Sequence, residues 1–144
     1  MRTPAWRWIT ESAVLAIHDE QVAEHGGLAG IRDKPLLLSA LARPQNLASY
    51  GDPDLAALAA AYAVGIARNH AFLDGNKRTA WVIAEVFLLK NGFELTTSDQ
   101  DGLTTMLAVA DGFLPEDQLA ASFRKWMIPI AGSTQGSPTE FPER

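Results

Sequence analysis

The 144-residue sequence contains no cysteine, which excludes disulfide bonds and thiolate chemistry. A helix that spans a bilayer needs about 20 consecutive apolar residues. The longest candidate in this sequence, Leu55 to Ala67, is too short. Positive charge is not in excess, and a net charge of −5 argues against broad binding of nucleic-acid phosphates. The stretch from Met1 to Trp8 has no apolar core of signal-peptide length. We therefore expect a cytoplasmic protein without membrane association or direct nucleic-acid binding.

Apolar residues make up 47% of the chain and charged residues 20%, a balance typical of a globular domain with one sizeable core. Helical spacing and capping residues recur along the sequence, and no internal repeat or second domain is evident. The fold class that this pattern predicts is all-α, with about six helices around a central buried pair. The six predicted helices run from Thr10 to Gly26, Asp33 to Pro44, Asp52 to about Asn69, Thr79 to Asn91, Ser98 or Asp99 to about Ala110, and Pro115 to Met127.

Three stretches lack a helical period. Gln45 to Gly51 is predicted to be an exposed loop, and Phe93 to Thr97 a short extended segment, too isolated to form a sheet. From Ile128 on, Pro, Gly, Ser and Thr dominate. The predicted domain therefore spans residues 1–127, and residues 128–144 form a C-terminal tail outside its core.

The polar stretch His70-Ala71-Phe72-Leu73-Asp74-Gly75-Asn76-Lys77-Arg78, here called the central motif, lies between two apolar helical runs. The second of these runs, Thr79 to Asn91, is apolar on nearly every face, and such a helix is usually buried. The two helices of the core would thus present a polar loop between them. This placement predicts a functional site.

The second half of the central motif has the composition of an anion site. A helix N-terminus offers unpaired N–H groups and a partial positive charge, and Gly75 would let a phosphate approach the backbone. Asn76 can add a side-chain donor, Lys77 a point charge, and Arg78 a fork that binds phosphate through two hydrogen bonds. Cations at the positive end of a helix are otherwise disfavoured, which strengthens the prediction of a polyphosphate site.

The first half supplies groups for chemistry. Asp74 directly precedes the phosphate-binding residues, and Mg²⁺ is commonly held by one or two carboxylates together with substrate phosphates. His70 can take a proton from an attacking hydroxyl near neutral pH, whereas Phe72 is expected to point into the core and anchor the loop. A base, a metal ligand and a phosphate site together indicate phosphoryl or nucleotidyl transfer.

These nine residues resemble the Fic/Doc family motif, H-x-F-x-D/N-G/A-N-K/G-R, and fit it at every specified position. The similarity extends to Gly26 through Gly30, Leu37 through Pro44 and Lys90 through Gly92, and covers roughly Trp8 to Met127. It implies an α-helical fold with the motif between two central helices, and ATP and Mg²⁺ as cofactors. By position, it implies His70 as the base, Asp74 as the metal ligand, Phe72 as the anchor, and Gly75, Asn76, Lys77 and Arg78 as the nucleotide-binding residues.

Two chemistries compete within that family. Most members look like adenylyltransferases, with glycine at the position of Lys77 and a second arginine at that of Trp81. The toxin branch of the family lacks this glycine and this second arginine, as this chain does. The resemblance to that branch implies transfer of the γ-phosphoryl group of ATP to elongation factor Tu and a block of translation. A lysine would occupy space that the usual pose needs, so the nucleotide would bind reversed. Gly75, however, matches the adenylylating members.

The resemblance also implies a partner. No self-inhibiting Ser/Thr-x-x-x-Glu-Gly/Asn segment is found, which points to inhibition by a separate antitoxin similar to Phd, folding onto the toxin near the site. Arg43 to Asp52 is either a target-docking flap, with Tyr50 as a contact, or an ordinary surface loop. A third function, a non-catalytic binding module, is disfavoured by the intact motif.

Several conspicuous side chains have simpler explanations. Arg68 is expected near a helix C-terminus in any case, and His18 and His25 are interpreted as structural. The aromatic residues Trp81, Phe87 and Trp126 are expected in the core.

Overall fold

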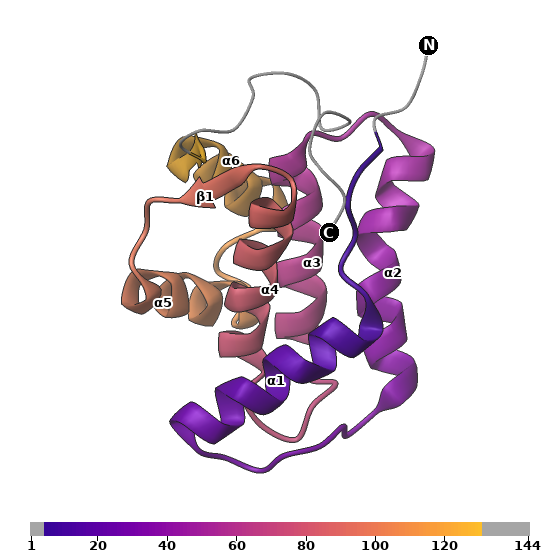
Figure 1. The fold of residues 1–144 in the computed structure, drawn as a ribbon, viewed down its shortest axis with the longest axis vertical. Helices are drawn as coiled ribbons and strands as arrows, with labels where there is room; N and C mark the ends of the chain where they lie inside the picture. The colour runs from indigo at the N-terminus through magenta and orange to yellow at the C-terminus, as the bar shows by residue number, and fades with distance from the viewer. Residues whose placement is uncertain (1–4, 131–144) are drawn as a thin grey trace.

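The computed structural model describes residues 5–130, and within them the chain forms six helices and a small two-stranded sheet (Figure 1). The helices are α1 (Glu11–His25), α2 (Lys34–Tyr50), α3 (Leu55–Asn69), α4 (Asn76–Lys90), α5 (Asp99–Ala110) and α6 (Glu116–Trp126). The strands are β1 (Phe93–Leu95) and β2 (Met127–Pro129). The predicted all-α class with six helices is confirmed.

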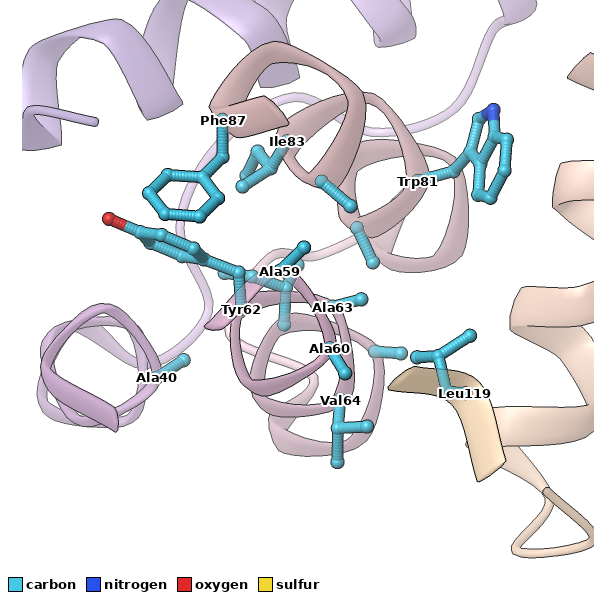
Figure 2. Close-up of a cluster of buried hydrophobic side chains, with 14 of the residues drawn as sticks. Ala40, Ala59, Ala60, Tyr62, Ala63, Val64, Trp81, Ile83, Phe87 and Leu119 are labelled. Carbon is cyan, nitrogen blue, oxygen red and sulfur yellow. The ribbon is translucent and has the colours of Figure 1, made fainter. Parts of the chain in front are cut away.

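Helices α3 and α4 form the predicted central pair, with α2 on one side and α5 and α6 on the other (Figure 1). Small side chains on α3 let its neighbours approach closely. A Cβ on Gly65 would lie 3.2 Å from the Cα of Ala40 in α2. Larger side chains pack between α3 and α4, where the rings of Tyr62 and Phe87 lie with their centroids 5.0 Å apart (Figure 2).

Three of the six helix starts follow local capping chemistry, as the sequence predicts. The side chain of Thr10 accepts a hydrogen bond from the N–H of Ala13, and that of Asp33 from the N–H of Leu36. Ser98 caps α5 in the same way. Such caps satisfy N–H groups that would otherwise lack partners in the first helical turn.

The predicted loop at Gln45 to Gly51 is wrong, because α2 continues through Pro44 to Tyr50. An internal proline disfavours a helix by about 3 kcal/mol. Here Leu47 and Ala48 pack against the core, and the Arg43 guanidinium donates to the Ala61 carbonyl, so tertiary contacts outweigh that cost. The segment considered as a docking flap is therefore helical as far as Tyr50, whose side chain is exposed.

The start of α3 is also displaced from its prediction. Asp54 caps the helix in place of Asp52, because its carboxylate accepts from the N–H of Ala57. The same carboxylate accepts two hydrogen bonds from Arg124 of α6, which lowers the pKa of Asp54. That contact joins segments 70 residues apart, so the local pattern gives no sign of it.

The extended segment after α4 does form a sheet, contrary to the prediction. β1 pairs antiparallel with β2, with Phe93 opposite Pro129. The partner lies more than 30 residues later and is brought back by α6. Ile128 and Pro129, assigned to the tail, are thus part of β2 while remaining exposed, and residues 131–144 lie outside the described residues.

No helix between residues 5 and 130 combines the length and the apolar character needed to cross a membrane.

The half-buried Glu85 of α4 makes stability depend on pH. Burial, with a smaller contribution from Asp99, raises the pKa of its carboxyl from 4.5 to about 7. Between these values the folded protein binds more protons than the unfolded chain, so stability should fall as pH rises. We expect the wild type to lose on the order of 1–3 kcal/mol between pH 4.5 and pH 8.

Urea unfolding of Glu85→Gln across this range should show a much flatter profile than the wild type. The exposed strand residue Glu94 provides the matched control, and Glu94→Gln should keep the wild-type slope. Parallel profiles for wild type and Glu85→Gln would show that Glu85 does not cause the dependence.

Candidate functional site

The central motif divides into a loop and a helix start. Residues 70–75, here called the motif loop, join α3 to α4 and lie beside α1 and the segment that joins α1 to α2 (Figure 1). Asn76, Lys77 and Arg78 form the first turn of α4, which begins three residues earlier than predicted.

His70 ends α3 in a left-handed conformation with φ 52°, and no other non-glycine residue in the described chain has a positive φ. Such a conformation is uncommon for residues with a side chain, and it tends to occur at functional positions. The His70 residue is exposed, and its ring has no hydrogen-bond partner among residues 5–130. The ring is therefore open to a substrate.

The start of α4 is uncapped and carries two cations. Its N-cap, Gly75, is left-handed with φ 78° and makes no side-chain hydrogen bond. The side chains of Lys77 and Arg78 have no ion-pair or hydrogen-bond partner in the described part of the chain. Unpaired N–H groups, the helix dipole and two free cations make this turn suitable for binding an anion.

Asn76 has a role that the sequence did not reveal. Its side-chain oxygen accepts from the Phe72 N–H at 3.0 Å, and its side-chain nitrogen donates to the Phe72 carbonyl at 3.0 Å. These paired bonds hold the motif loop against α4. The amide retains one further N–H, so its predicted contact with phosphate stays a prediction.

A buried histidine of α1 supports the loop from the other side. Phe72 is 1% exposed, and the His18 ring stacks on it with centroids 3.7 Å apart and planes 8° from parallel. His18 Nε2 lies 2.7 Å from the Asp74 carbonyl oxygen, and because a carbonyl only accepts, Nε2 carries the proton. His18 is structural, as predicted, but it directly positions the motif loop.

The carboxylate of Asp74 is oriented by the segment that follows α1. Its Oδ2 accepts from the Leu28 N–H at 2.7 Å. The preceding Gly27 has φ +113°, and a Cβ there would come within 3.0 Å of the Asp74 Cβ. Only glycine fits this close approach without strain.

Arg32 fixes the end of α3. Its Nε donates to the His70 carbonyl at 2.6 Å, and its guanidinium also donates to the Asn69 carbonyl. The backbone of the same segment pairs with the motif loop, where the Leu73 N–H donates to the Gly30 carbonyl. The left-handed turn at His70 is therefore held by contacts from residues about 40 positions away.

Sequence reasoning missed Arg32 and the positioning role of His18. One signal was present for His18, since a histidine on the buried face of α1 with Val14 requires a polar partner. Arg68, left outside the site, donates to the carbonyls of Val109 and Leu114 and links α3 to the turn after α5.

The side chains near the motif loop suit a magnesium ion only when a phosphate-bearing ligand is bound with it. No group of three or more His, Asp or Glu side chains capable of holding a metal occurs within residues 5–130. Asp74 offers one exposed carboxylate beside the open turn of α4. Mg²⁺ suits such an arrangement, because it retains water and binds one or two carboxylates plus substrate phosphates.

Comparison with known proteins finds one matching family and two similar chains. The Fic/DOC family model matches residues 8–88. "Protein kinase doc" of Escherichia phage P1 is 33% identical over 120 residues, which cover 83% of this chain and 94% of that protein. "Toxin Doc" of Mycolicibacterium smegmatis is 50% identical over 72 residues, 49% of this chain and 55% of that protein.

Proposed function

The chain belongs to the Fic/DOC family, and on this basis we propose that it is the toxin of a toxin–antitoxin module, acting as a protein phosphotransferase that uses ATP and Mg²⁺. The names of its two relatives, a protein kinase and a toxin, support both parts of the proposal. We propose elongation factor Tu as the substrate and a Phd-like antitoxin as the partner.

One observation carries the proposal: the uncapped first turn of α4, with two unpaired cations, adjoins a loop that exposes His70 and Asp74. A structural loop would not leave Lys77 and Arg78 unpaired at the positive end of a helix. Bound phosphates would supply the missing negative charge.

The proposed reaction gives each of these residues a role. His70 accepts the proton of the target hydroxyl, whose oxygen then bonds to the γ-phosphorus of ATP. The bond from the γ-phosphorus to the β,γ-bridging oxygen breaks, and ADP leaves. Lys77, Arg78 and the N–H groups of α4 bind the phosphates. Asp74 is the residue that would hold Mg²⁺, whose charge offsets that of the phosphates when it is bound.

Adenylyl transfer is the second candidate, and Gly75 favours it. Lys77 and Trp81 favour phosphoryl transfer. Trp81 is 2% exposed, and its side chain projects from α4 on the side away from Phe87 (Figure 2). Its ring packs against Phe123, with the ring centroids 6.0 Å apart. No cation extends from this position to bind a terminal phosphate.

A translation assay tests the proposal. Elongation factor Tu is incubated with the protein, Mg²⁺ and ATP, repurified, and added to a translation system that depends on it. We expect it to have lost its activity, whereas factor treated without ATP should support normal translation. Full activity after treatment with ATP would refute elongation factor Tu as the target.

Substitution of Gly27 should impair the reaction through Asp74. Gly27→Ala adds a Cβ against the Asp74 side chain, so we expect a higher Mg²⁺ requirement for transfer and a rate lower by about tenfold, or about 1.4 kcal/mol. Gly30→Ala is the matched control, because Gly30 has φ +112° and a Cβ there would meet only Leu73 at 3.7 Å. Both variants should lose similar stability. Equal Mg²⁺ profiles would contradict the role of Gly27.

A further inference from the structure

An open pocket of about 690 Å³ lies between α5 and the C-terminal end of α6. Its volume falls within the range of ligand-binding clefts. No residue of the central motif lines it, and neither His18 nor Arg32 does. Its chemistry is set by five polar side chains and one indole, which belong to Thr96, Ser98, Asp101, Thr104, Thr105 and Trp126.

The pocket is assembled from two parts of the chain. Asp101, Thr104 and Thr105 share one face of α5, because residues three and four positions apart are neighbours on a helix. Thr96 follows β1, and its N–H and its hydroxyl both donate to the Trp126 carbonyl, each at 3.0 Å. These two bonds hold the last residue of α6 beside the segment that leads into α5.

The threonine hydroxyls of the pocket present lone pairs to a ligand. Like Thr96, Thr104 and Thr105 donate to backbone carbonyls, in their case one turn earlier in α5, at 3.1 and 2.8 Å. A hydroxyl has only one hydrogen, so each of these three oxygens can take part in a further bond only as an acceptor. A ligand that satisfies them must therefore bring hydrogen-bond donors.

The charge of the pocket favours a cation. Among the described residues, no lysine, arginine or histidine lines the pocket, and the exposed Asp101 carboxylate has no hydrogen-bond or ion-pair partner. The partial positive charge at the start of α5 is offset by two carboxylates in its first turn, those of Asp99 and Asp101. The whole chain carries a net charge of −5, which adds to the attraction.

Trp126 makes a guanidinium the cation that fits best. Its indole is half-buried and lines the pocket. The neighbouring rings of Trp81 and Phe123 meet it at 72° and 63°, so neither stacks flat on it. A guanidinium is planar, stacks on aromatic rings and carries five N–H donors in a fixed arrangement. An ammonium group offers only three donors and is more strongly hydrated.

We propose that this pocket binds an arginine side chain of a partner protein, with the guanidinium against Trp126 and its N–H groups donating to Asp101 and to the threonine hydroxyls. An arginine within a protein suits the site better than free arginine, because the free amino acid also carries a carboxylate, which Asp101 would repel. The pocket is separate from the central motif, so this inference goes beyond the proposed function and does not depend on ATP.

An NMR titration of the full chain tests the proposal. The first probe is acetyl-glycyl-arginyl-glycinamide. Two further peptides replace its arginine with lysine or with citrulline, which keeps the shape of arginine without the charge, and the fourth probe is free L-arginine. The signals to follow are the indole N–H of Trp126 and the backbone N–H groups of Thr104 and Thr105.

Two matched variants locate the site. Asp101→Asn removes the charge of the carboxylate but keeps its size. Asp117→Asn is the control, because Asp117 is also exposed in the first turn of a helix, α6, and does not line the pocket. Thermal unfolding of both variants checks that each is folded.

We expect the arginine peptide to shift these signals and to bind at least roughly threefold more tightly than the lysine peptide, the citrulline peptide or free arginine. Asp101→Asn should weaken binding of the arginine peptide by roughly threefold to fivefold, whereas Asp117→Asn should bind it like the wild type.

Several results would overturn the inference. Equal binding of the lysine or the citrulline peptide would show that the pocket does not select a guanidinium. Free arginine that bound as tightly as the peptide would make this a small-molecule site. Unchanged affinity in Asp101→Asn, or an arginine peptide that left the three signals in place, would show that the pocket does not hold the cation.

Discussion

Replacing His70 with asparagine should lower the rate of phosphoryl transfer by a factor of about 10²–10⁴, the usual contribution of a general base. The choice of asparagine matters, because His70 has φ 52° and asparagine enters this left-handed region more readily than most residues. The fold should therefore be retained while the proton acceptor is lost. Rates under single-turnover conditions, together with thermal unfolding, separate the two effects.

His70→Ala provides the comparison, since alanine is strained in the left-handed region by roughly 1–2 kcal/mol. It should be as inactive as His70→Asn but less stable. The exposed Gln118 on α6 serves as the control, and Gln118→Ala should keep wild-type activity. If His70→Asn retained more than about a tenth of the wild-type rate, general-base catalysis by His70 would be excluded. Growth arrest by an inactive His70 variant would favour the non-catalytic binding module.

Gly102→Ala should destabilise the protein by about 3 kcal/mol, although this change usually stabilises a helix. A Cβ on Gly102 of α5 would overlap the Trp81 indole at Cε2, far inside van der Waals contact. The indole cannot easily retreat, because it packs against Phe123 and Trp126 at centroid distances of 6.0 and 6.5 Å. Either α5 or the indole must move. Urea denaturation measures the loss directly.

A double mutant locates the cause. Trp81→Leu removes the ring that Gly102→Ala would contact, so the combined variant should be more stable than the sum of the two single effects predicts. Thr104→Ala, an exposed change on the same helix, should alter stability by no more than about 0.5 kcal/mol. A Gly102→Ala variant more stable than the wild type would show that α5 does not pack so closely on α4.

The sequence predicts those features whose causes are local. Thr10, Asp33 and Ser98 cap helices within three residues of themselves, so their patterns identify the helix starts correctly. Proline breaks a helix by a local mechanism too, but Pro44 remains helical because Leu47 packs against the core. A three-dimensional contact outweighs the local preference there.

In the candidate site, too, local features could be predicted from the sequence and long-range contacts could not. The candidate catalytic and binding residues could be named from the motif, because each is recognisable by type and spacing. Their support could not, since His18 contacts Asp74 across 56 positions and Arg32 contacts His70 across 38. The paired bonds of Asn76 are local, but they depend on a loop conformation that the sequence does not specify.

Whether this chain transfers the γ-phosphoryl group of ATP is tested most directly by the origin of the phosphate label that reaches the target. The protein is incubated with Mg²⁺, elongation factor Tu and ATP labelled on either the α- or the γ-phosphate. Label that reaches the factor only from the γ-position is the predicted result. Label that arrives from the α-position would make the chain an adenylyltransferase and would contradict the inferences drawn from Lys77 and Trp81.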